Sequence, residues 1–159
     1  MFFFSFTYLN TNTKIEKKRC IVLVEDNPGD IMLAKEVIMH LGLDVDLTVL
    51  MDGEQVIEFL EEAQHLKKGW PDLILLDLNL PKKDGREVLK YIKTHQKLRR
   101  IPVCILTTSN AEHDINETYS LNANSYLTKP LDFNQFLETF KELNDFWFNT
   151  VLLPERKEY

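Results

Sequence analysis

The stretch PDLILLDLNLPKKDG, residues 71–85, decides the fold that we expect for this chain. Within it Leu73–Leu76 is an unbroken apolar run, and the acid Asp77 follows at once. Such a run predicts a strand that is buried on both faces, as in a parallel sheet covered by helices. Asp77 would then lie at the carboxyl end of the strand, where open α/β sheets hold their functional groups.

Length and composition favour one soluble domain. The chain has 159 residues, 44% of them hydrophobic and 28% charged, which is ordinary for a globular protein. A net charge of −6 argues against nucleic acid as the main partner, and we expect the short basic run at residues 14–19 to be a solvated arm. We expect no membrane span, because no apolar run approaches the roughly 20 residues that cross a bilayer.

The N-terminus and the cysteines indicate where the protein works. The first ten residues, MFFFSFTYLN, are apolar but lack the basic start and the small-residue cleavage site of a signal peptide. Cys20 and Cys104 fall in expected strands without CxxC spacing, so we interpret them as buried thiols. Because such thiols persist in a reducing compartment, we expect a cytoplasmic protein.

Five apolar runs alternate with five amphipathic segments along the chain. We expect strands at residues 20–24, 44–50, 73–76, 101–106 and 125–128, each followed by a helix. This alternation predicts right-handed crossovers and a parallel sheet with helices on both faces. The fold class is therefore α/β, a doubly wound, flavodoxin-like sheet of five strands in the order 2-1-3-4-5 with five helices. The second strand should lie at an edge, because its apolar residues alternate with polar ones.

Capping residues mark where the helices should begin and end. Asn27 and Asp132 have side chains that suit the N-cap position. Ser109 and Glu112 have the spacing of a capping box at the start of the fourth helix. Asn122 should close that helix in the left-handed conformation that glycine usually takes.

Polar side chains follow four of the five strands directly. Glu25 and Asp26 follow the first strand, Asp77 the third, Thr107 the fourth and Lys129 the fifth. Because the carboxyl ends of parallel strands share one edge of a sheet, these side chains should converge on one pocket. The alternative interpretation is that each of them only solvates a loop.

This set of groups favours phosphoryl chemistry at a carboxylate. Two carboxylates about 5 Å apart repel by roughly 3 kcal/mol at an effective dielectric of about 20, so crowded acids take up a proton or hold a cation. Carboxylate and carbonyl oxygens suit Mg²⁺, which shares its ligands with phosphate. Lys129 is a point charge that can meet an anion, and a carboxylate can itself be the nucleophile in phosphoryl transfer.

Several short motifs lie at the same strand ends. They are Glu25-Asp26, the D-x-N-x-P pattern of residues 77–81, Asp84-Gly85, Thr107, Tyr126 and Lys129-Pro130. With these motifs the chain resembles the CheY-like receiver domain of response regulators, the phosphoacceptor half of two-component signalling. The receiver would span residues 19–147, with a flexible arm at residues 1–18 and a tail at residues 148–159. The segments NLPKKDGREVL, IPVCILTTS and FWFNTVLLP are similar to those of stand-alone regulators that pair with cyanobacterial phytochromes.

The resemblance implies a role in phosphorylation for four pocket residues. Asp77 would accept a phosphoryl group from a phosphohistidine, while Thr107 and Lys129 would bind the phosphate oxygens. Tyr126 would be the switch aromatic, whose ring turns inward as the Thr107 hydroxyl moves toward the phosphate. The peptide bond between Lys129 and Pro130 would be cis, a form that is common only before proline.

The resemblance also implies one cofactor, Mg²⁺. Asp26 and Asp77 would bind the ion directly, and Asn79 would bind it through its main-chain carbonyl. Glu25 would bind it through water. No other cofactor-binding residues are implied.

The partners implied by the resemblance are signalling proteins. The donor would be a sensor histidine kinase, phytochrome-like in this subfamily, and the protein would not be an enzyme beyond its own Mg²⁺-dependent phosphorylation and dephosphorylation. The last helix should run to about Trp147, and Phe146, Phe148 and residues 151–153 add further apolar side chains. We expect the tail, the fourth and fifth helices and the last strand to form a homodimer interface. The alternative is a tail that folds back on its own domain.

Two other functions compete with this one. A haloacid-dehalogenase-type phosphatase also uses a strand-terminal aspartate with Mg²⁺, but it needs a second carboxylate two residues on, where this chain has Asn79. A degenerate interaction module that is never phosphorylated would not need the complete set of pocket residues. P-loop and dinucleotide-binding functions are excluded, because neither GxxxxGK[ST] nor GxGxxG occurs among the five glycines.

Overall fold

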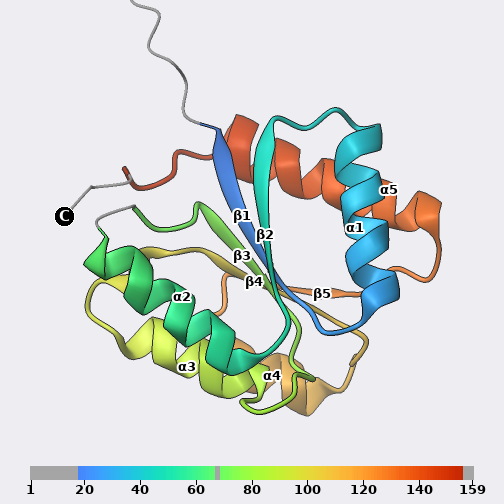
Figure 1. Cartoon of the computed structure of the whole chain (residues 1–159). Helices are drawn as coiled ribbons and strands as arrows, with labels where there is room; N and C mark the ends of the chain where they lie inside the picture. Colours follow the sequence, from blue (N-terminus) through green and yellow to red (C-terminus); the bar gives the residue numbers. More distant parts are fainter. Residues whose placement is uncertain (1–17, 67–68, 156–159) are drawn as a thin grey trace, which may run out of the picture.

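Five parallel strands form the central layer of the fold (Figure 1). The computed structural model describes residues 18–66 and 69–155. The strands are β1 (Arg19–Val24), β2 (Val45–Leu50), β3 (Leu73–Leu76), β4 (Val103–Thr107) and β5 (Ser125–Thr128), and their order is β2-β1-β3-β4-β5. Every neighbouring pair is parallel. The predicted fold class, the strand order and the position of β2 at an edge are therefore confirmed.

Helices cover both faces of this sheet. They are α1 (Pro28–His40), α2 (Gly53–His65), α3 (Gly85–Thr94), α4 (Glu112–Ser120) and α5 (Phe133–Asn144). In Figure 1, α1 and α5 lie on one face, while α2 and α3 lie on the other with α4 beyond them. None of the helices in the described parts of the chain is both long and apolar enough to cross a membrane.

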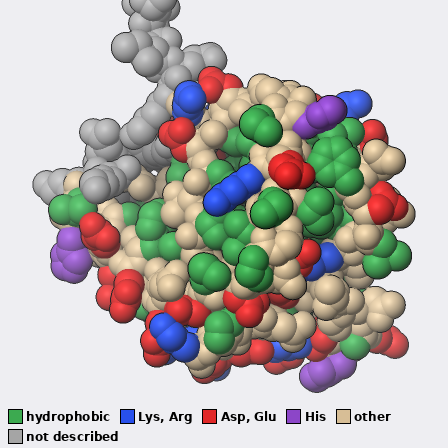
Figure 2. Space-filling model, turned by 45° about the vertical axis from the view of Figure 1, so that its right-hand side comes forward, with side chains coloured by type: hydrophobic (Ala, Val, Ile, Leu, Met, Phe, Trp, Pro, Cys, Tyr) green, Lys and Arg blue, Asp and Glu red, His purple; other side chains and the backbone are tan. Residues whose placement is uncertain are grey.

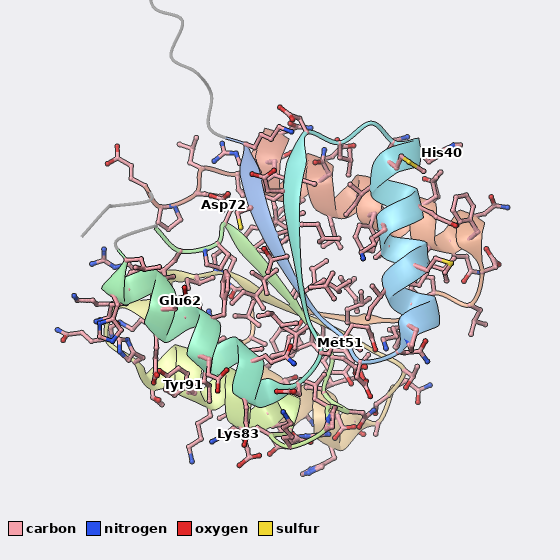
Figure 3. All side chains as sticks on the ribbon, viewed as in Figure 1. His40, Met51, Glu62, Asp72, Lys83 and Tyr91 are labelled. Carbon is pink, nitrogen blue, oxygen red and sulfur yellow. The ribbon has the colours of Figure 1, made fainter. Side chains whose placement is uncertain are left out.

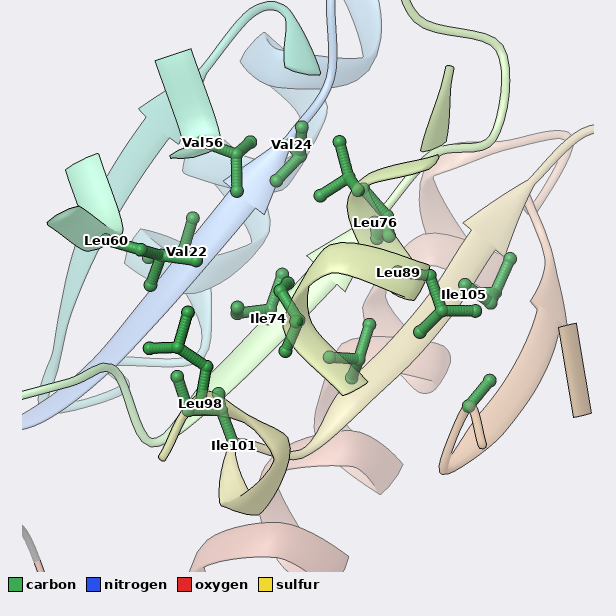
Figure 4. Packing of buried hydrophobic residues seen from close by; sticks show 14 of the residues in the cluster. Val22, Val24, Val56, Leu60, Ile74, Leu76, Leu89, Leu98, Ile101 and Ile105 are labelled. Atoms are coloured by element: carbon green, nitrogen blue, oxygen red, sulfur yellow. The ribbon is translucent and has the colours of Figure 1, made fainter. Parts of the chain in front are cut away.

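Two hydrophobic clusters join the helices to the sheet. In the first, Leu60 of α2 and Leu89 of α3 pack on Val22, Ile74 and Ile105 of three neighbouring strands (Figure 4). All five of these side chains are fully withdrawn from solvent. Burial of one such side chain contributes about 1.5–3 kcal/mol, so truncation of Ile74 at the centre of the sheet would destabilise the whole domain.

The second cluster lies under α1 and α5. Phe136 and Phe140 of α5 stack with ring centroids 5.7 Å apart and pack with Val37 of α1 on the sheet. Cys104 is buried in this cluster, as predicted, whereas Cys20 is only partly buried. The apolar stripe of the last helix is thus used for packing on its own sheet.

Most of the predicted caps are present. The Asn27 side chain accepts hydrogen bonds from the N–H groups of Gly29 (2.8 Å) and Asp30 (3.1 Å) at the start of α1. Asp132 accepts from the N–H of Gln135 (2.9 Å) at the start of α5. Asn122, with φ of 66°, takes the left-handed conformation after α4. These local signals fix the helix ends that face the loops.

The predicted capping box of the fourth helix is wrong. The N-cap of α4 is Ala111, which makes no side-chain cap. Ser109 lies two residues earlier, and its hydroxyl donates to the Asp114 carboxylate (2.5 Å). The Ser109 oxygen also accepts from the Ala111 N–H (3.3 Å), so this side chain caps the turn before the helix rather than the helix itself. β4 also begins two residues later than predicted, at Val103, after a proline that has no N–H to donate.

The chain continues beyond α5 in a wider helical form. A π-helical turn covers Asp145–Thr150, and the Val151 N–H donates to the Phe146 carbonyl (3.0 Å). Trp147 and Phe148 pack against the second cluster, and the Arg19 guanidinium lies 6.0 Å from the centre of the Phe148 ring. The alternative of a folded-back segment therefore holds for these two side chains, whereas Phe146 stays 50% exposed. The predicted arm, except Lys18, and residues 156–159 of the tail lie outside the described residues.

Candidate functional site

Three acids meet at the carboxyl edge of the sheet. Glu25 and Asp26 follow β1, and Asp77 follows the adjacent β3. Each offers a carboxylate oxygen, and these oxygens lie within 4.8 Å of one another. Glu25 and Asp77 are held by main-chain bonds that continue the sheet, from their N–H groups to Leu50 (2.9 Å) and Val24 (3.0 Å). In Figure 3, Met51 marks this edge and Asp72 marks the opposite one.

Lys129 projects into the acidic cluster from the end of β5. Its Nζ lies 2.8 Å from Asp77 Oδ2, 2.5 Å from Glu25 Oε2 and 2.9 Å from Asp30 Oδ2. Only 7% of the Lys129 side chain is exposed. Burial alone would lower the pKa of Lys129, but its hydrogen bonds to the three carboxylates raise that pKa above its ordinary value. The ammonium group is therefore a permanent positive charge beside Asp77.

Glu25 is the most deeply buried of the three acids. Burial raises the pKa of the Glu25 carboxyl, although hydrogen bonds from Lys129 and from the Asn27 N–H (2.9 Å) act in the opposite direction. Asp26 is more open to solvent than the other two acids. The site thus combines a buried wall with one accessible carboxylate, an arrangement that lets a hydrated cation enter from solvent.

Asp77 is only 5% exposed and is held from both sides. Its Oδ2 accepts from Lys129, and its Oδ1 accepts from the N–H of Asn79 (3.2 Å). A Cβ on Gly85 would lie 2.2 Å from the Asp77 carbonyl oxygen, so only glycine fits at that position. The carboxylate is therefore oriented before any ligand arrives.

Thr107 supplies an unused hydroxyl at the end of β4. The residue is fully buried, and its Oγ1 has no hydrogen-bond partner within the described structure. Its carbonyl accepts from the Lys129 N–H (2.7 Å), which aligns the two strand ends. An unpaired buried hydroxyl costs free energy that a bound anion would recover by accepting from it.

Tyr126 and Arg86 form a polar connection beside the pocket. The Tyr126 hydroxyl donates to the Ser109 carbonyl (2.9 Å), in the loop that follows Thr107. The Ser109 hydroxyl reaches Asp114, which also pairs with the Arg86 guanidinium. Arg86 extends the connection to Asp84 (3.0 Å) and Glu117 (3.0 Å). The loop after β4 is thereby tied to both α3 and α4.

One member of the site was not predicted from the sequence, and one peptide bond was predicted in the wrong isomer. Asp30, in the first turn of α1, binds Lys129 and was not among the predicted site residues. An acid near the first turn of a helix that begins at this edge was the available signal. The expected cis bond before Pro130 is also wrong, since no cis peptide occurs in the described residues. Trans is the more stable isomer even before proline, by about 0.5–1 kcal/mol.

The donor set fits a divalent cation. Three carboxylates lie close together, and the Lys129 ammonium offsets part of their charge. The carboxylates offer the hard oxygen ligands that Mg²⁺ prefers. A second group of possible ligands, His113, Asp114 and Glu117, lies on α4. There the Arg86 guanidinium already pairs with both acids, so that group needs no metal ion.

Comparisons with known proteins agree with this site. The family model of the response regulator receiver domain matches residues 21–141. Response regulator Rcp1 of Synechocystis sp. (strain ATCC 27184 / PCC 6803 / Kazusa) is 44% identical over 137 residues, which cover 86% of this chain and 93% of Rcp1. The phosphorylated cyanobacterial phytochrome response regulator RcpA superposes with a TM-score of 0.81 at 41% identity, covering 87% of this chain and 100% of RcpA. The Mn²⁺-bound form of Rcp1 gives 0.78 at 43% identity, covering 86% and 99%.

The chain belongs to the response regulator receiver domain family. Members of this family are signalling phosphoacceptors rather than enzymes, and they bind Mg²⁺ or Mn²⁺ at an acidic site. The cluster of Glu25, Asp26 and Asp77 is that site in this chain.

Proposed function

We propose that Asp77 accepts a phosphoryl group from a sensor histidine kinase, with Asp26, Asp77, the Asn79 carbonyl and Glu25 as the Mg²⁺ ligands. The observation that carries this proposal is the contact between Lys129 Nζ and Asp77 Oδ2, 2.8 Å, inside a cluster of three acids. The alternative of strand-end acids that only solvate loops does not account for a carboxylate that is 5% exposed and oriented from both sides.

The transfer moves one phosphoryl group between two nucleophiles. A carboxylate oxygen of Asp77 forms a bond to phosphorus while the bond from phosphorus to the donor imidazole nitrogen breaks, and the nitrogen keeps the electron pair. Bound Mg²⁺ supplies neutralising charge for the phosphoryl oxygens. Lys129 holds its positive charge beside the reacting carboxylate, and the unpaired Thr107 hydroxyl donates to a phosphoryl oxygen.

The phosphorylated state would be sensed through Thr107 and Tyr126. When the Thr107 hydroxyl moves toward the new phosphoryl group, the loop that contains Ser109 moves with it. Tyr126 follows that loop, because its hydroxyl donates to the Ser109 carbonyl. The change in local charge thus biases the position of an aromatic ring at the surface of α4 and β5.

Phosphorylation at a single acid tests the proposal. The full chain is incubated with acetyl phosphate and Mg²⁺, and incorporation is followed by intact-protein mass spectrometry and by acid lability. Wild type should gain one phosphate, and Asp77→Asn should gain none. Asp72→Asn is the matched control, because Asp72 is equally buried but lies at the opposite edge of the sheet. Labelling of Asp77→Asn at the wild-type level would show that the acceptor is another residue.

The donor that we propose is a phytochrome-like histidine kinase. The support is similarity to RcpA, which is described as a cyanobacterial phytochrome response regulator, at 41% identity. Phosphotransfer profiling against the histidine kinases of the same genome tests this, and preferential transfer from a kinase of another sensor class would refute it. The cytoplasmic location and the absence of nucleic acid and membrane partners stay predictions.

We also propose a homodimer that uses α4, β5, α5 and the tail. Its support is exposed apolar surface: Leu131 before α5 is 93% exposed, Leu152 in the tail 100% and Phe146 50%. Apolar groups at such exposure suit an interface with a second copy. Leu152→Ser should shift sedimentation toward the monomer, whereas Met39→Ser on α1, 76% exposed, should not. A wild-type protein that sediments as a monomer, with or without beryllofluoride, would exclude the dimer.

Figure 2 shows the side of the molecule that lies on the right in Figure 1, where hydrophobic side chains are interspersed with charged ones. Met32 on α1 is 61% exposed. The mixed character of this face is ordinary for a solvated surface.

A further inference from the structure

The loop between β3 and α3 carries Asn79 and is fixed at both ends. At its start, the Asn79 N–H donates to Asp77 Oδ1 (3.2 Å). At its end, the Gly85 N–H donates to the Leu78 carbonyl (2.9 Å), and a Cβ on Gly85 would lie 2.2 Å from the Asp77 carbonyl oxygen. The position of the middle of the loop, residues 81–83, is therefore set by what those residues contact.

Lys82 in the middle of this loop has an unusual backbone. Its φ is 64°, the left-handed region that a residue with a Cβ adopts only at a cost in free energy. Its side chain leaves the loop and crosses to α2, where Nζ lies 2.8 Å from Asp52 Oδ2 and 3.7 Å from Glu54 Oε2. The strained backbone thus coincides with an ion pair to another element.

Asp52 is a firm anchor for that ion pair. Only 7% of its side chain is exposed. It caps α2 by accepting from the Gln55 N–H (2.9 Å), and it also accepts from Gln55 Nε2 (3.1 Å). The carboxylate therefore keeps its position whether or not Lys82 is present.

The backbones of the loop and of α2 are also in direct contact. A Cβ on Gly53 would lie 2.4 Å from the Lys83 carbonyl oxygen, so the first residue of α2 has no space for a side chain. Figure 3 shows Lys83 beside the start of α2. The loop thus rests on the first turn of α2, and the ion pair holds it there.

We propose that Lys82 and Asp52 are positioning residues for the metal site, because their ion pair ties the loop that presents the Asn79 carbonyl to the start of α2. This inference rests on the proposed function, in which that carbonyl is a Mg²⁺ ligand. Neither residue touches the ion. They restrict the loop before the ion binds, and residues outside the first coordination shell that hold a ligand in place change metal affinity.

The test compares three variants of the full chain. Lys82→Asn removes the ammonium group but keeps a residue that tolerates positive φ. Lys82→Arg keeps the charge, and Lys83→Gln removes one positive charge from the next residue, which makes no ion pair in the described structure. The dissociation constant for Mg²⁺ is measured by calorimetry, and amide exchange of residues 79–84 is measured in metal-free protein.

Lys82→Asn should raise the Mg²⁺ dissociation constant by about 3- to 5-fold, because the Lys82 side chain is 53% exposed and solvent screens its ion pair, and it should speed amide exchange in the loop. Lys82→Arg should restore most of both properties, and Lys83→Gln should resemble wild type. The loss of acetyl phosphate labelling in Lys82→Asn should be largely recovered at high Mg²⁺ concentration.

If Lys82→Asn binds Mg²⁺ like wild type, the positioning role is overturned while the proposed function stands. Equal weakening by Lys82→Asn and Lys83→Gln would also overturn it, because a general charge effect would then suffice. A wild-type protein that binds no Mg²⁺ would overturn both this inference and the proposed function.

Discussion

Two lysines at opposite edges of the sheet, Lys129 with a buried side chain and Lys93 partly buried, meet different partners. Lys129, at the carboxyl edge, is surrounded by the carboxylates of Asp77, Glu25 and Asp30. Lys93, in the last turn of α3, donates to neutral oxygens, namely the Ile101 carbonyl (2.8 Å), the Asn124 side chain (3.0 Å) and the Arg99 carbonyl (3.4 Å). Only the first lysine is paired with carboxylates.

The partners of each lysine determine whether its pKa is raised or lowered. Burial lowers the pKa of Lys93 to about 8, although the charge interaction with Cys104 acts in the opposite direction. For Lys129, bonds to carboxylates outweigh burial and raise the pKa. The same side chain is therefore a permanent cation at the functional edge and a titratable group at the other edge. The difference shows that burial alone does not identify a functional lysine.

The largest effect is expected from Lys129→Met. Phosphorylation of Asp77 by acetyl phosphate should fall by about 10²-fold, because a preorganised positive charge at the transferring group is lost. In EDTA the variant should lose about 3 kcal/mol of stability, because buried carboxylates are left without a counter-charge. Added Mg²⁺ should recover part of that loss. Urea denaturation with and without Mg²⁺ measures both effects.

Lys35→Met on α1 is the control, since it removes an exposed lysine. Equal stability of Lys129→Met and Lys35→Met in EDTA would mean that the ion pairs of Lys129 with the buried carboxylates do not stabilise the fold.

A smaller effect is expected from Lys93→Met. The variant should lose about 1–2 kcal/mol at pH 7, the contribution of a few hydrogen bonds to main-chain and amide oxygens. Phosphorylation should not change, because Lys93 lies at the other edge of the sheet. Lys90→Met, on an exposed position of the same helix, should leave stability within error.

The pH dependence of stability sharpens the contrast. Between pH 8 and the ordinary lysine value of 10.5, Lys93 is neutral in the folded chain but still protonated when unfolded. The unfolded state then binds more protons, so the contribution of Lys93 to stability increases as pH rises. The difference in stability between wild type and Lys93→Met should therefore grow from pH 8 to 10.5. A constant difference would show that the Lys93 pKa is not lowered.

The smallest effect is expected from Arg86→Met. Arg86 resembles Lys129 in pairing only with carboxylates, but its side chain is 23% exposed against 7%. Solvent screening reduces such pairs to about 1 kcal/mol or less. Thermal unfolding at low and high salt measures the loss. An equal loss of stability in Arg86→Met and Lys129→Met would show that solvent exposure does not weaken the ion pairs of Arg86.

The sequence predicted the sheet and most of its functional edge because both follow from short-range patterns. The apolar run of Leu73–Leu76 and the alternation in Val45–Leu50 place the strands, and parallel strands bring Glu25, Asp77 and Lys129 to one edge. Asp30 could not be assigned to the site, because its distance to Lys129 depends on how α1 lies against the sheet. The position of α4 likewise could not be predicted, so the hydrogen bond from the Ser109 hydroxyl to the Asp114 carboxylate of that helix was not expected.

The π-helical turn at Asp145–Thr150 makes the orientation of the aromatic segment sensitive to residue count. Phe146 points to solvent while Trp147 and Phe148 face the sheet. Deleting one residue in this turn would rotate everything after it by roughly a quarter of a turn about the helix axis. Phe148 would then leave Arg19 and turn toward water. A single-codon deletion would thus bring an aromatic side chain of the C-terminal segment from the inner to the outer surface without altering the composition elsewhere.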